Sequence, residues 1–194
     1  MDRTTSDNVV RCNWVSKGGP EEIRYHDEEW GVPVYDDQVL FECITLEGAQ
    51  AGLSWKTILL KREGYRAAFS GFDPEKVARF TDKRQLKLLE NPAIIRNKLK
   101  VASTITNAQA FLEVANEFNS FSNYLWDFAG GEPIKNGWEN SSQVPASTPL
   151  SDKLSKDLKK RGFRFVGTTI CYSFLQATGV INDHLVTCFR YDQV

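Results

Sequence analysis

The chain has 194 residues, of which 41% are hydrophobic and 25% are charged, and its formal net charge is −1. This length allows one compact core or two lobes that share one, and the composition is that of an ordinary globular protein. Because no run approaches the roughly 20 apolar residues that span a bilayer, we expect no membrane association.

Helical periodicity recurs along the chain, whereas sustained alternation of the strand type is absent. Asp37 is placed to cap a first long helix. The residues of that helix expected to face inward are Leu40, Phe41 and Ile44. The segment 48–53 interrupts it, and Ser54 is placed to cap the next helix. Pro74 opens a further helix, since proline suits the first helical position.

The middle of the chain predicts three more helices. A basic helix passes through Leu86 and Leu89 and ends at Asn91-Pro92. The next helix carries an apolar stripe at helical spacing, which consists of Val101, Ile105, Ala108 and Leu112. Another helix covers residues 121–128.

Residues 130–149 are rich in Gly, Pro, Ser and Asn, which predicts a long loop. Ser151 then restarts a helix that stops near Gly162, and a buried helix extends to Gly179. The apolar residues assigned to this last helix are Val166, Ile170, Phe174 and Ala177. The fold class that these patterns predict is all-α, without internal repeats.

Residues 1–8 are polar, so we expect no secretory signal there and a location in the cytoplasm, where thiols stay reduced. The four cysteines are then free thiols or metal ligands rather than disulfides. Cys43 and Cys171 lie among apolar residues, and we expect both to pack in the core.

The remaining cysteines and the two histidines form a candidate metal site. His184 and Cys188 are four residues apart, so on a helix they would share one face and could bind one ion. Cys12 and His26 would supply two more ligands, and four protein ligands make a closed, structural zinc site. The alternative is a chance pairing at 184 and 188, with Cys12 as an ordinary thiol.

Two neighbouring segments place large aromatic rings close to carboxylates. Tyr25 and Trp30 lie in the first segment, and Glu47 and Trp55 lie in the second. Aromatic faces suit stacking on a nucleobase, and a carboxylate accepts hydrogen bonds from an amine or a ring N–H. The alternative is core aromatics with a surface glutamate, which the helical spacing of Trp55 with apolar neighbours favours.

Basic residues gather in two stretches, 75–100 and 153–164, although the net charge is near zero. Local fields rather than the total charge steer a polyanion such as DNA. The alternative for each stretch is an ordinary solvated helix face.

Five blocks together resemble the constitutive bacterial 3-methyladenine DNA glycosylase I family. The blocks are RCNWV at 11–15, YHDEEWGVP at 25–33, LEGAQAGLSW at 46–55, KRGFRFVGTTICYS at 160–173 and NDH at 182–184. They occur in the family's order, and the similarity covers nearly all of residues 11–188.

The resemblance implies a helix-hairpin-helix DNA glycosylase fold in a single unit. Its central lobe would cover about 37–130, and its second lobe would combine 9–36 with 131–190. The hairpin would fall at 91–96, with Ala93 where a glycine is usual. One structural Zn²⁺ would join the N- and C-terminal segments, held by Cys12, His26, His184 and Cys188.

The activity that the resemblance implies is hydrolysis of the N-glycosidic bond of 3-methyladenine in double-stranded alkylated DNA. The products would be an abasic site and free 3-methyladenine. The base pocket matches Tyr25, Trp30, Glu47 and Trp55. Since methylation at N3 lets the base depart neutral, selective binding would outweigh general acid chemistry. Glu47 is therefore the catalytic candidate in a recognition and electrostatic role.

Contacts with DNA would come from two loops. Gly52 and Leu53 would enter the gap that the flipped nucleotide leaves, with leucine as the apolar wedge. Arg96 and Lys98, near the hairpin, would hold phosphates, unless they are simply solvated. Since no lysine stands out as a nucleophile for strand cleavage, we expect base removal only. We also expect the protein to act as a monomer.

Two other functions fit part of this pattern. A non-catalytic, zinc-stabilised module that binds damaged DNA would share the basic stretches and the metal site. A zinc hydrolase would hold an open metal with His26, His184 and a carboxylate, and four protein ligands argue against it.

Overall fold

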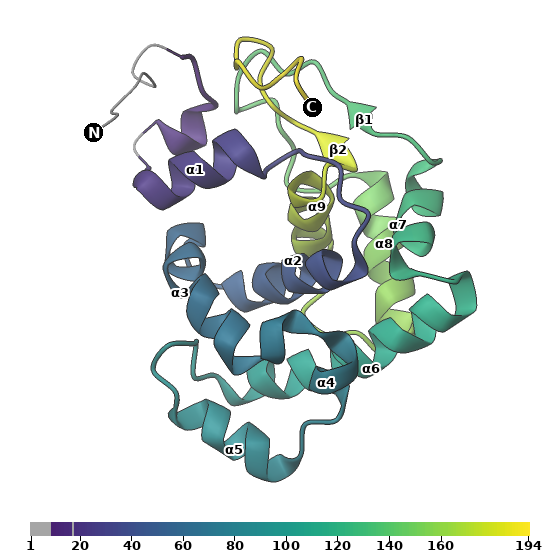
Figure 1. Ribbon diagram of the computed structural model, residues 1–194. Helices are drawn as coiled ribbons and strands as arrows, with labels where there is room; N and C mark the ends of the chain where they lie inside the picture. The colour runs from purple at the N-terminus through teal and green to yellow at the C-terminus, as the bar shows by residue number, and fades with distance from the viewer. Residues whose placement is uncertain (1–8, 17) are drawn as a thin grey trace.

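The computed structural model describes residues 9–16 and 18–194, and helices dominate this part of the chain (Figure 1). The polar residues 1–8, in which we expected no secretory signal, lie outside the described residues. Among the helices of the described ranges, none is both long and apolar enough to cross a membrane.

The helices after residue 36 follow one another in the order that the sequence predicts, whereas the helix at 20–28 was not predicted. In the first half they are η1 (Asn13–Val15), α1 (Pro20–Glu28), α2 (Asp37–Gln50), α3 (Trp55–Ala68), η2 (Ser70–Phe72), α4 (Pro74–Ala78) and α5 (Asp82–Glu90). In the second half they are α6 (Lys98–Phe118), α7 (Phe121–Ala129), β1 (Ile134–Lys135), α8 (Pro149–Lys160), α9 (Thr168–Ala177) and β2 (Ile181–Asn182). The predicted cap at Ser54 is confirmed, since its hydroxyl accepts from Thr57 N–H, and Pro74 does open a helix.

Helix α2 lies at the centre of the molecule and contacts α3, α6, α7 and α9 (Figure 1). Leu40, Phe41 and Ile44 of α2 are buried, as predicted. The carboxylates of Glu42 and Glu47 are buried on the same helix, where a charge is costly unless it is compensated. The central helix therefore carries polar groups into the interior, next to the candidate site.

The all-α prediction needs one correction, because β1 and β2 form a short parallel pair. Ile134 pairs with Ile181 and Lys135 with Asn182. Two residues per strand are too few to show the alternation by which strands are recognised. The pair joins the predicted loop after α7 to the C-terminal segment, at the same end of the molecule as α1 (Figure 1).

The starts of three helices also differ from the prediction. Asp36, rather than Asp37, caps α2, and its carboxylate accepts from Val39 N–H at 2.9 Å. The carboxylate of Asp37 instead caps the start of α7, where it accepts from the main-chain N–H groups of Phe121 (2.9 Å) and Ser122 (2.8 Å). The sequence alone does not show which of the two adjacent aspartates caps α2, because the residues that Asp37 binds are far from it in sequence.

Helix α8 begins at Pro149, before the predicted Ser151, because Thr148 forms a capping box with Ser151 and proline occupies the first turn. Helix α9 begins at Thr168, so Val166 precedes it. The carbonyl of Val166 accepts from the Ser155 hydroxyl at 2.6 Å, which fastens this turn to α8.

Candidate active site and metal cluster

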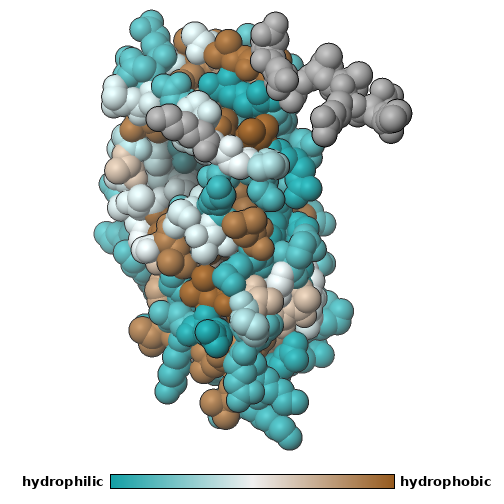
Figure 2. All heavy atoms as spheres, turned by 90° about the vertical axis from the view of Figure 1, so that its left-hand side faces the viewer, coloured by the Kyte–Doolittle hydropathy of each residue, from teal (hydrophilic) through white to brown (hydrophobic). Residues whose placement is uncertain are grey.

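A cavity of about 340 Å³ lies between the end that carries α1 and the helices α2 and α3. Its lining includes all four residues predicted for the base pocket, which are Tyr25, Trp30, Glu47 and Trp55. Figure 2 shows the corresponding face of the molecule hollowed in its upper part. Side chains that are far apart in sequence thus surround one opening that is large enough for a purine ring.

Aromatic rings form one wall of the cavity. The ring centroids of Tyr25 and Trp55 are 5.1 Å apart with an interplanar angle of 55°. Trp30 packs edge-on against Trp14, with ring centroids 5.3 Å apart. Trp14 remains 40% exposed, so part of its indole is accessible from the cavity side. These surfaces suit a flat aromatic ligand.

Glu47 is placed on α2 with only 3% of its surface exposed. Burial raises the pKa of its carboxyl group from 4.5 to about 8. The Oε2 atom is buried and has no hydrogen-bond partner among the described residues. An orphaned carboxyl oxygen at the wall of a cavity is what a site for a ligand with N–H donors requires.

The indole Nε1 of Trp55 is a second buried polar atom for which the described residues supply no partner. It belongs to the first turn of α3, whose start is fixed by the Ser54 cap. Since Glu47 accepts and Trp55 Nε1 donates, the cavity offers both kinds of hydrogen bond to one bound base.

The opposite wall contains Asp183, to which the sequence analysis assigned no role. Its carboxylate accepts from Asn136 Nδ2, Trp138 Nε1 and Gln176 Nε2, each at 2.7 Å, and from the Tyr172 hydroxyl. These donors come from the loop after β1 and from α9, so Asp183 fastens two elements behind the cavity. Its signal in the sequence was its place in the NDH block.

Other lining residues were also missed, namely Asn13, Gln50, Ser141, Val144, Ser173 and Leu185, in addition to Trp14, Gln176 and Asp183. Trp14 and Ser173 lie within blocks that carry the family resemblance, which gave a signal without a role. Ser141 and Val144 come from the long loop, where no pattern indicated a contribution to the site.

The four predicted metal ligands lie together and are all buried. Their ligand atoms, two thiol sulfurs and two imidazole nitrogens, lie within 4.8 Å of one another. The Cys188 sulfur is 3.5 Å from His26 Nε2 and 3.4 Å from His184 Nδ1, and the Cys12 sulfur is 3.6 Å from His184 Nδ1. Around a tetrahedral zinc ion, sulfur and nitrogen ligands lie about 3.5 Å apart, so these residues fit the metal.

The second nitrogen of each imidazole is also occupied. His26 Nδ1 lies 2.8 Å from Asp27 Oδ1, and His184 Nε2 lies 3.0 Å from the carbonyl oxygen of Trp30. Asp27 in turn accepts from Arg11 at 2.7 Å. A carboxylate or carbonyl on the outer nitrogen is typical of metal-binding histidines, because it fixes the tautomer and the ring orientation.

The expectation that His184 and Cys188 share a helix face is wrong. The chain after β2 forms a series of turns, and the main-chain N–H of Cys188 donates to Leu185 O at 2.7 Å. The Cys12 sulfur also accepts from Leu185 N–H at 3.4 Å. Turns bring the two ligands together where the four-residue spacing predicted a helix.

Cys43 and Cys171 lie apart from this cluster. Cys171 is buried in the core, and Cys43 is partly buried against it, so the prediction of core packing is confirmed. Desolvation raises the pKa of each of these thiols to about 12, which keeps them protonated and unreactive at neutral pH.

The loop between α2 and α3 carries Gly52 and Leu53. Gly52 has a φ of 77°, a conformation that suits glycine, and the space around its missing Cβ is open. Leu53 is 39% exposed, and its N–H donates to Gln50 O at 2.6 Å. The structure therefore presents an apolar side chain at the surface on a tightly turned loop.

Residues 91–97 connect α5 to α6 and lie against α3. Lys61 donates to Pro92 O at 2.7 Å, and Ile95 N–H donates to the Tyr65 hydroxyl at 3.2 Å. The side chain of Asn91 accepts from Ala93 N–H at 3.0 Å. None of residues 91–97, all of which the structure describes, has a positive φ, so this turn accommodates alanine at 93.

Arg96 and Lys98, the two predicted phosphate contacts, are exposed beside this connection. Arg96 lies in the connection that packs against α3, the helix that follows the loop with Leu53, and Lys98 is the first residue of α6. The structure leaves their basic groups accessible to an anionic partner.

Comparison with known proteins places this chain among base-removing DNA repair enzymes. Residues 14–191 match the family model described as methyladenine glycosylase. The DNA-3-methyladenine glycosylase 1 of Escherichia coli K12 is 51% identical over 183 residues, which cover 94% of this chain and 97% of the relative. The DNA-3-methyladenine glycosylase of Haemophilus influenzae is 46% identical over 180 residues, which cover 93% and 97%.

Solved structures indicate the same family as the sequence comparison. A crystal structure of 3-methyladenine DNA glycosylase I has a TM-score of 0.90 at 51% identity and covers 93% of this chain and 98% of that chain. The Staphylococcus aureus enzyme, solved to explain its recognition of 3-methyladenine, has a TM-score of 0.90 at 38% identity, with 93% and 96% covered. The chain therefore belongs to the methyladenine glycosylase family.

Proposed function

We propose that this protein is a monofunctional DNA glycosylase that excises 3-methyladenine from alkylated double-stranded DNA. The observation that carries the proposal is the buried Glu47 oxygen without a partner, at the wall of a cavity lined by Tyr25, Trp30 and Trp55. Membership of the family and the name of its relatives supply the substrate and the reaction.

In the proposed mechanism, the flipped base stacks on the aromatic wall, and its polar edge donates hydrogen bonds to Glu47. Accepting a hydrogen bond compensates the desolvation of the carboxylate, so binding would lower the pKa of Glu47 from about 8. The methylated base carries positive charge before cleavage and departs neutral, so no strong general acid is required. Contacts that hold the departing base accelerate cleavage where they strengthen toward the transition state.

Leu53 is the proposed wedge that fills the gap in the DNA stack, and Gly52 provides the turn that presents it. Residues 91–96 are the proposed hairpin of a helix-hairpin-helix element formed with α5 and α6. Most main-chain N–H groups of this turn already donate within the protein, so the exposed side chains of Arg96 and Lys98 would hold phosphates and set the register without reading sequence. In this arrangement residues 37–130 form a DNA-binding lobe, and 9–36 with 131–190 form a second lobe.

We propose that the metal cluster holds one Zn²⁺ in a structural role. Cys12, His26, His184 and Cys188 would complete a closed tetrahedral set, which leaves no position for a substrate. The ion would tie the segment before α1 to the segment after β2 and so support Trp30, whose carbonyl oxygen lies 3.0 Å from His184 Nε2. This closed ligand set argues against a zinc hydrolase.

We also propose that the protein acts as a monomer in the cytoplasm, where the reduced thiols that bind zinc are maintained. Its macromolecular partner is DNA, and its product is free 3-methyladenine.

The direct test of the activity is chromatography of the bases that the protein releases from alkylated DNA. The proposal predicts free 3-methyladenine and intact strands with abasic sites. DNA binding without release of any base would overturn the enzyme proposal and favour a binding module.

A further inference from the structure

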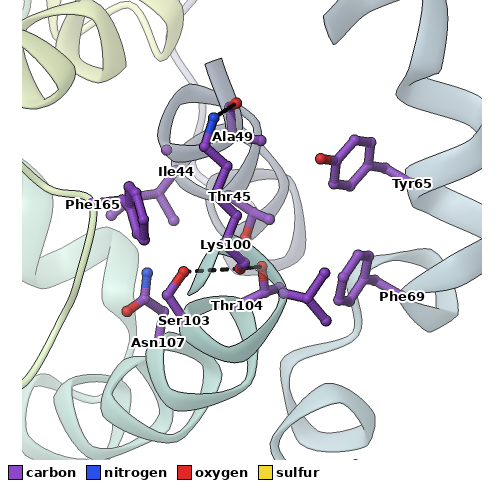
Figure 3. Close-up of a pocket in the computed structure, with 12 residues that line it drawn as sticks. Ile44, Thr45, Ala49, Tyr65, Phe69, Lys100, Ser103, Thr104, Asn107 and Phe165 are labelled. Carbon is purple, nitrogen blue, oxygen red and sulfur yellow. Dashed lines mark hydrogen bonds between the residues drawn. The ribbon is translucent and has the colours of Figure 1, made fainter. Parts of the chain in front are cut away.

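Lys100 lies in the first turn of α6, yet only 9% of its surface is exposed. Its Nζ donates to two main-chain carbonyl oxygens, those of Ala49 and Ala51, each at 2.7 Å. Figure 3 shows the side chain extending from α6 toward α2, with the amine at the carbonyl group of Ala49. Burying a lysine is costly, and desolvation lowers the pKa of this one, so the contacts must offset that cost.

The two acceptors lie at the end of α2, where the last carbonyl groups lack an N–H donor within the helix. Ala51 directly precedes Gly52 and Leu53, the loop that carries the proposed wedge. A positive charge at a helix C-terminus is favourable both through these hydrogen bonds and through the helix dipole. Lys100 therefore fixes the point from which the wedge loop leaves the helix.

The main chain of Lys100 is held at the start of α6, next to the proposed hairpin. Asn97 caps α6 by accepting from the N–H groups of Leu99 (3.0 Å) and Lys100 (3.1 Å). The carbonyl oxygen of Lys100 accepts from the hydroxyls of Ser103 (2.8 Å) and Thr104 (2.9 Å), which Figure 3 also shows. The side chain thus spans from the end of the proposed hairpin to the base of the wedge loop.

We propose that Lys100 is a positioning residue for base flipping, which couples the phosphate-binding hairpin to the Leu53 wedge. This inference rests on the proposed function, and in particular on the wedge role of Leu53. Lys100 does not line the base cavity, so it touches neither the base nor the reacting atoms. It acts through the main chain of residues 49–53.

The test compares Lys100→Met, which keeps the length of the side chain and removes the amine, with Leu53→Ala. The loss of two hydrogen bonds from a charged donor predicts a kcat/KM for 3-methyladenine excision from duplex DNA that is about 10- to 100-fold lower. Binding of free 3-methyladenine, measured by calorimetry, should stay within about twofold of the unaltered protein, since it needs no wedge.

The double variant gives the decisive reading. If Lys100 acts through Leu53, the two substitutions together reduce kcat/KM by little more than Leu53→Ala alone. Multiplied effects, unaltered activity of Lys100→Met, or unaltered activity of Leu53→Ala would each overturn the proposal. Absence of excision by the unaltered protein would instead refute the proposed function itself.

Two further variants separate the role of the Lys100 amine from effects of net charge and of stability. Lys135→Met removes the same charge from an exposed position on β1, outside both basic stretches, and should leave kcat/KM nearly unchanged, whereas an equal loss would mean that net charge is responsible. If Lys100→Met melts below the assay temperature, Lys100→Gln keeps a donor on the side chain. Activity of Lys100→Gln between those of Lys100→Met and the unaltered protein supports the proposal, and free-base binding lost in parallel with excision contradicts it.

Discussion

Gly64 of α3 lies against the main chain of Ala93. A Cβ added at Gly64 would lie 2.3 Å from the carbonyl oxygen of Ala93 and 2.7 Å from its Cβ. Only a residue without a side chain lets the proposed hairpin approach α3 this closely. Helix α3 also begins beside the loop that carries Leu53.

The first prediction follows from this contact. Gly64→Ala should force the hairpin away from α3 and destabilise the fold by about 1–3 kcal/mol through overpacking, which outweighs the gain in helix propensity. Denaturant unfolding measures the loss, and DNA affinity should fall with it. Gly137→Ala, in open space, is the matched control, with an expected change within about 1 kcal/mol.

The second prediction concerns Glu47 and pH. Its pKa of about 8 in the folded state lies above the 4.5 of the unfolded chain, so the folded state binds the additional proton between these values. The free energy of unfolding should therefore fall as pH rises from 4.5 to 8, by at most about 1.4 kcal/mol per pH unit from this group.

Glu47→Gln should remove that contribution, so the stability difference between variant and unaltered protein should shift in favour of the variant as pH rises. Unfolding curves at pH 5, 6.5 and 8 measure the difference. A difference that is constant across this range would show that the carboxyl group is not held protonated.

The third prediction concerns the metal. Cys188→Ser should abolish stoichiometric zinc and lower the melting temperature by about 10 °C or more, because metal-binding free energy is folding free energy. Weakened base binding should accompany it, since His184 contacts Trp30. Cys171→Ser, at a buried thiol outside the cluster, should retain zinc despite some loss of stability. Full zinc content in Cys188→Ser would contradict the ligand assignment.

The fourth prediction concerns Asp183. Asp183→Asn would place an amide N–H₂ group against donors on the loop after β1 or on α9, and we expect a cost of about 1–3 kcal/mol. The cavity wall should loosen, so the KM for DNA should rise. The rise should exceed what partial unfolding of the variant would cause. Unchanged melting temperature and KM would show that the four donors do not require a carboxylate.

Much of the fold was predictable, because helical periodicity and caps are local. Ser54 and Pro74 show this, since each acts on the helix that it begins. The role of Asp37 and the pairing of β1 with β2 were missed, because both depend on partners distant in sequence.

The candidate site shows the same division. The grouping of Tyr25, Trp30, Glu47 and Trp55 around one cavity was expected from the aromatic and acidic segments and from the family resemblance. The Glu47 oxygen without a hydrogen-bond partner and the contacts of Lys100 with main-chain carbonyls were not expected. No residue pattern encodes the partners of a buried polar atom.

The most direct test of the central claim is calorimetric titration of free 3-methyladenine into the protein and into Glu47→Gln. We expect one base bound per chain, with affinity at least about tenfold lower in the variant, because a hydrogen bond to a charged acceptor contributes about 1.5–3 kcal/mol. Equal affinity in the two proteins, or no binding to either, would contradict the claim that Glu47 recognises the base in this cavity.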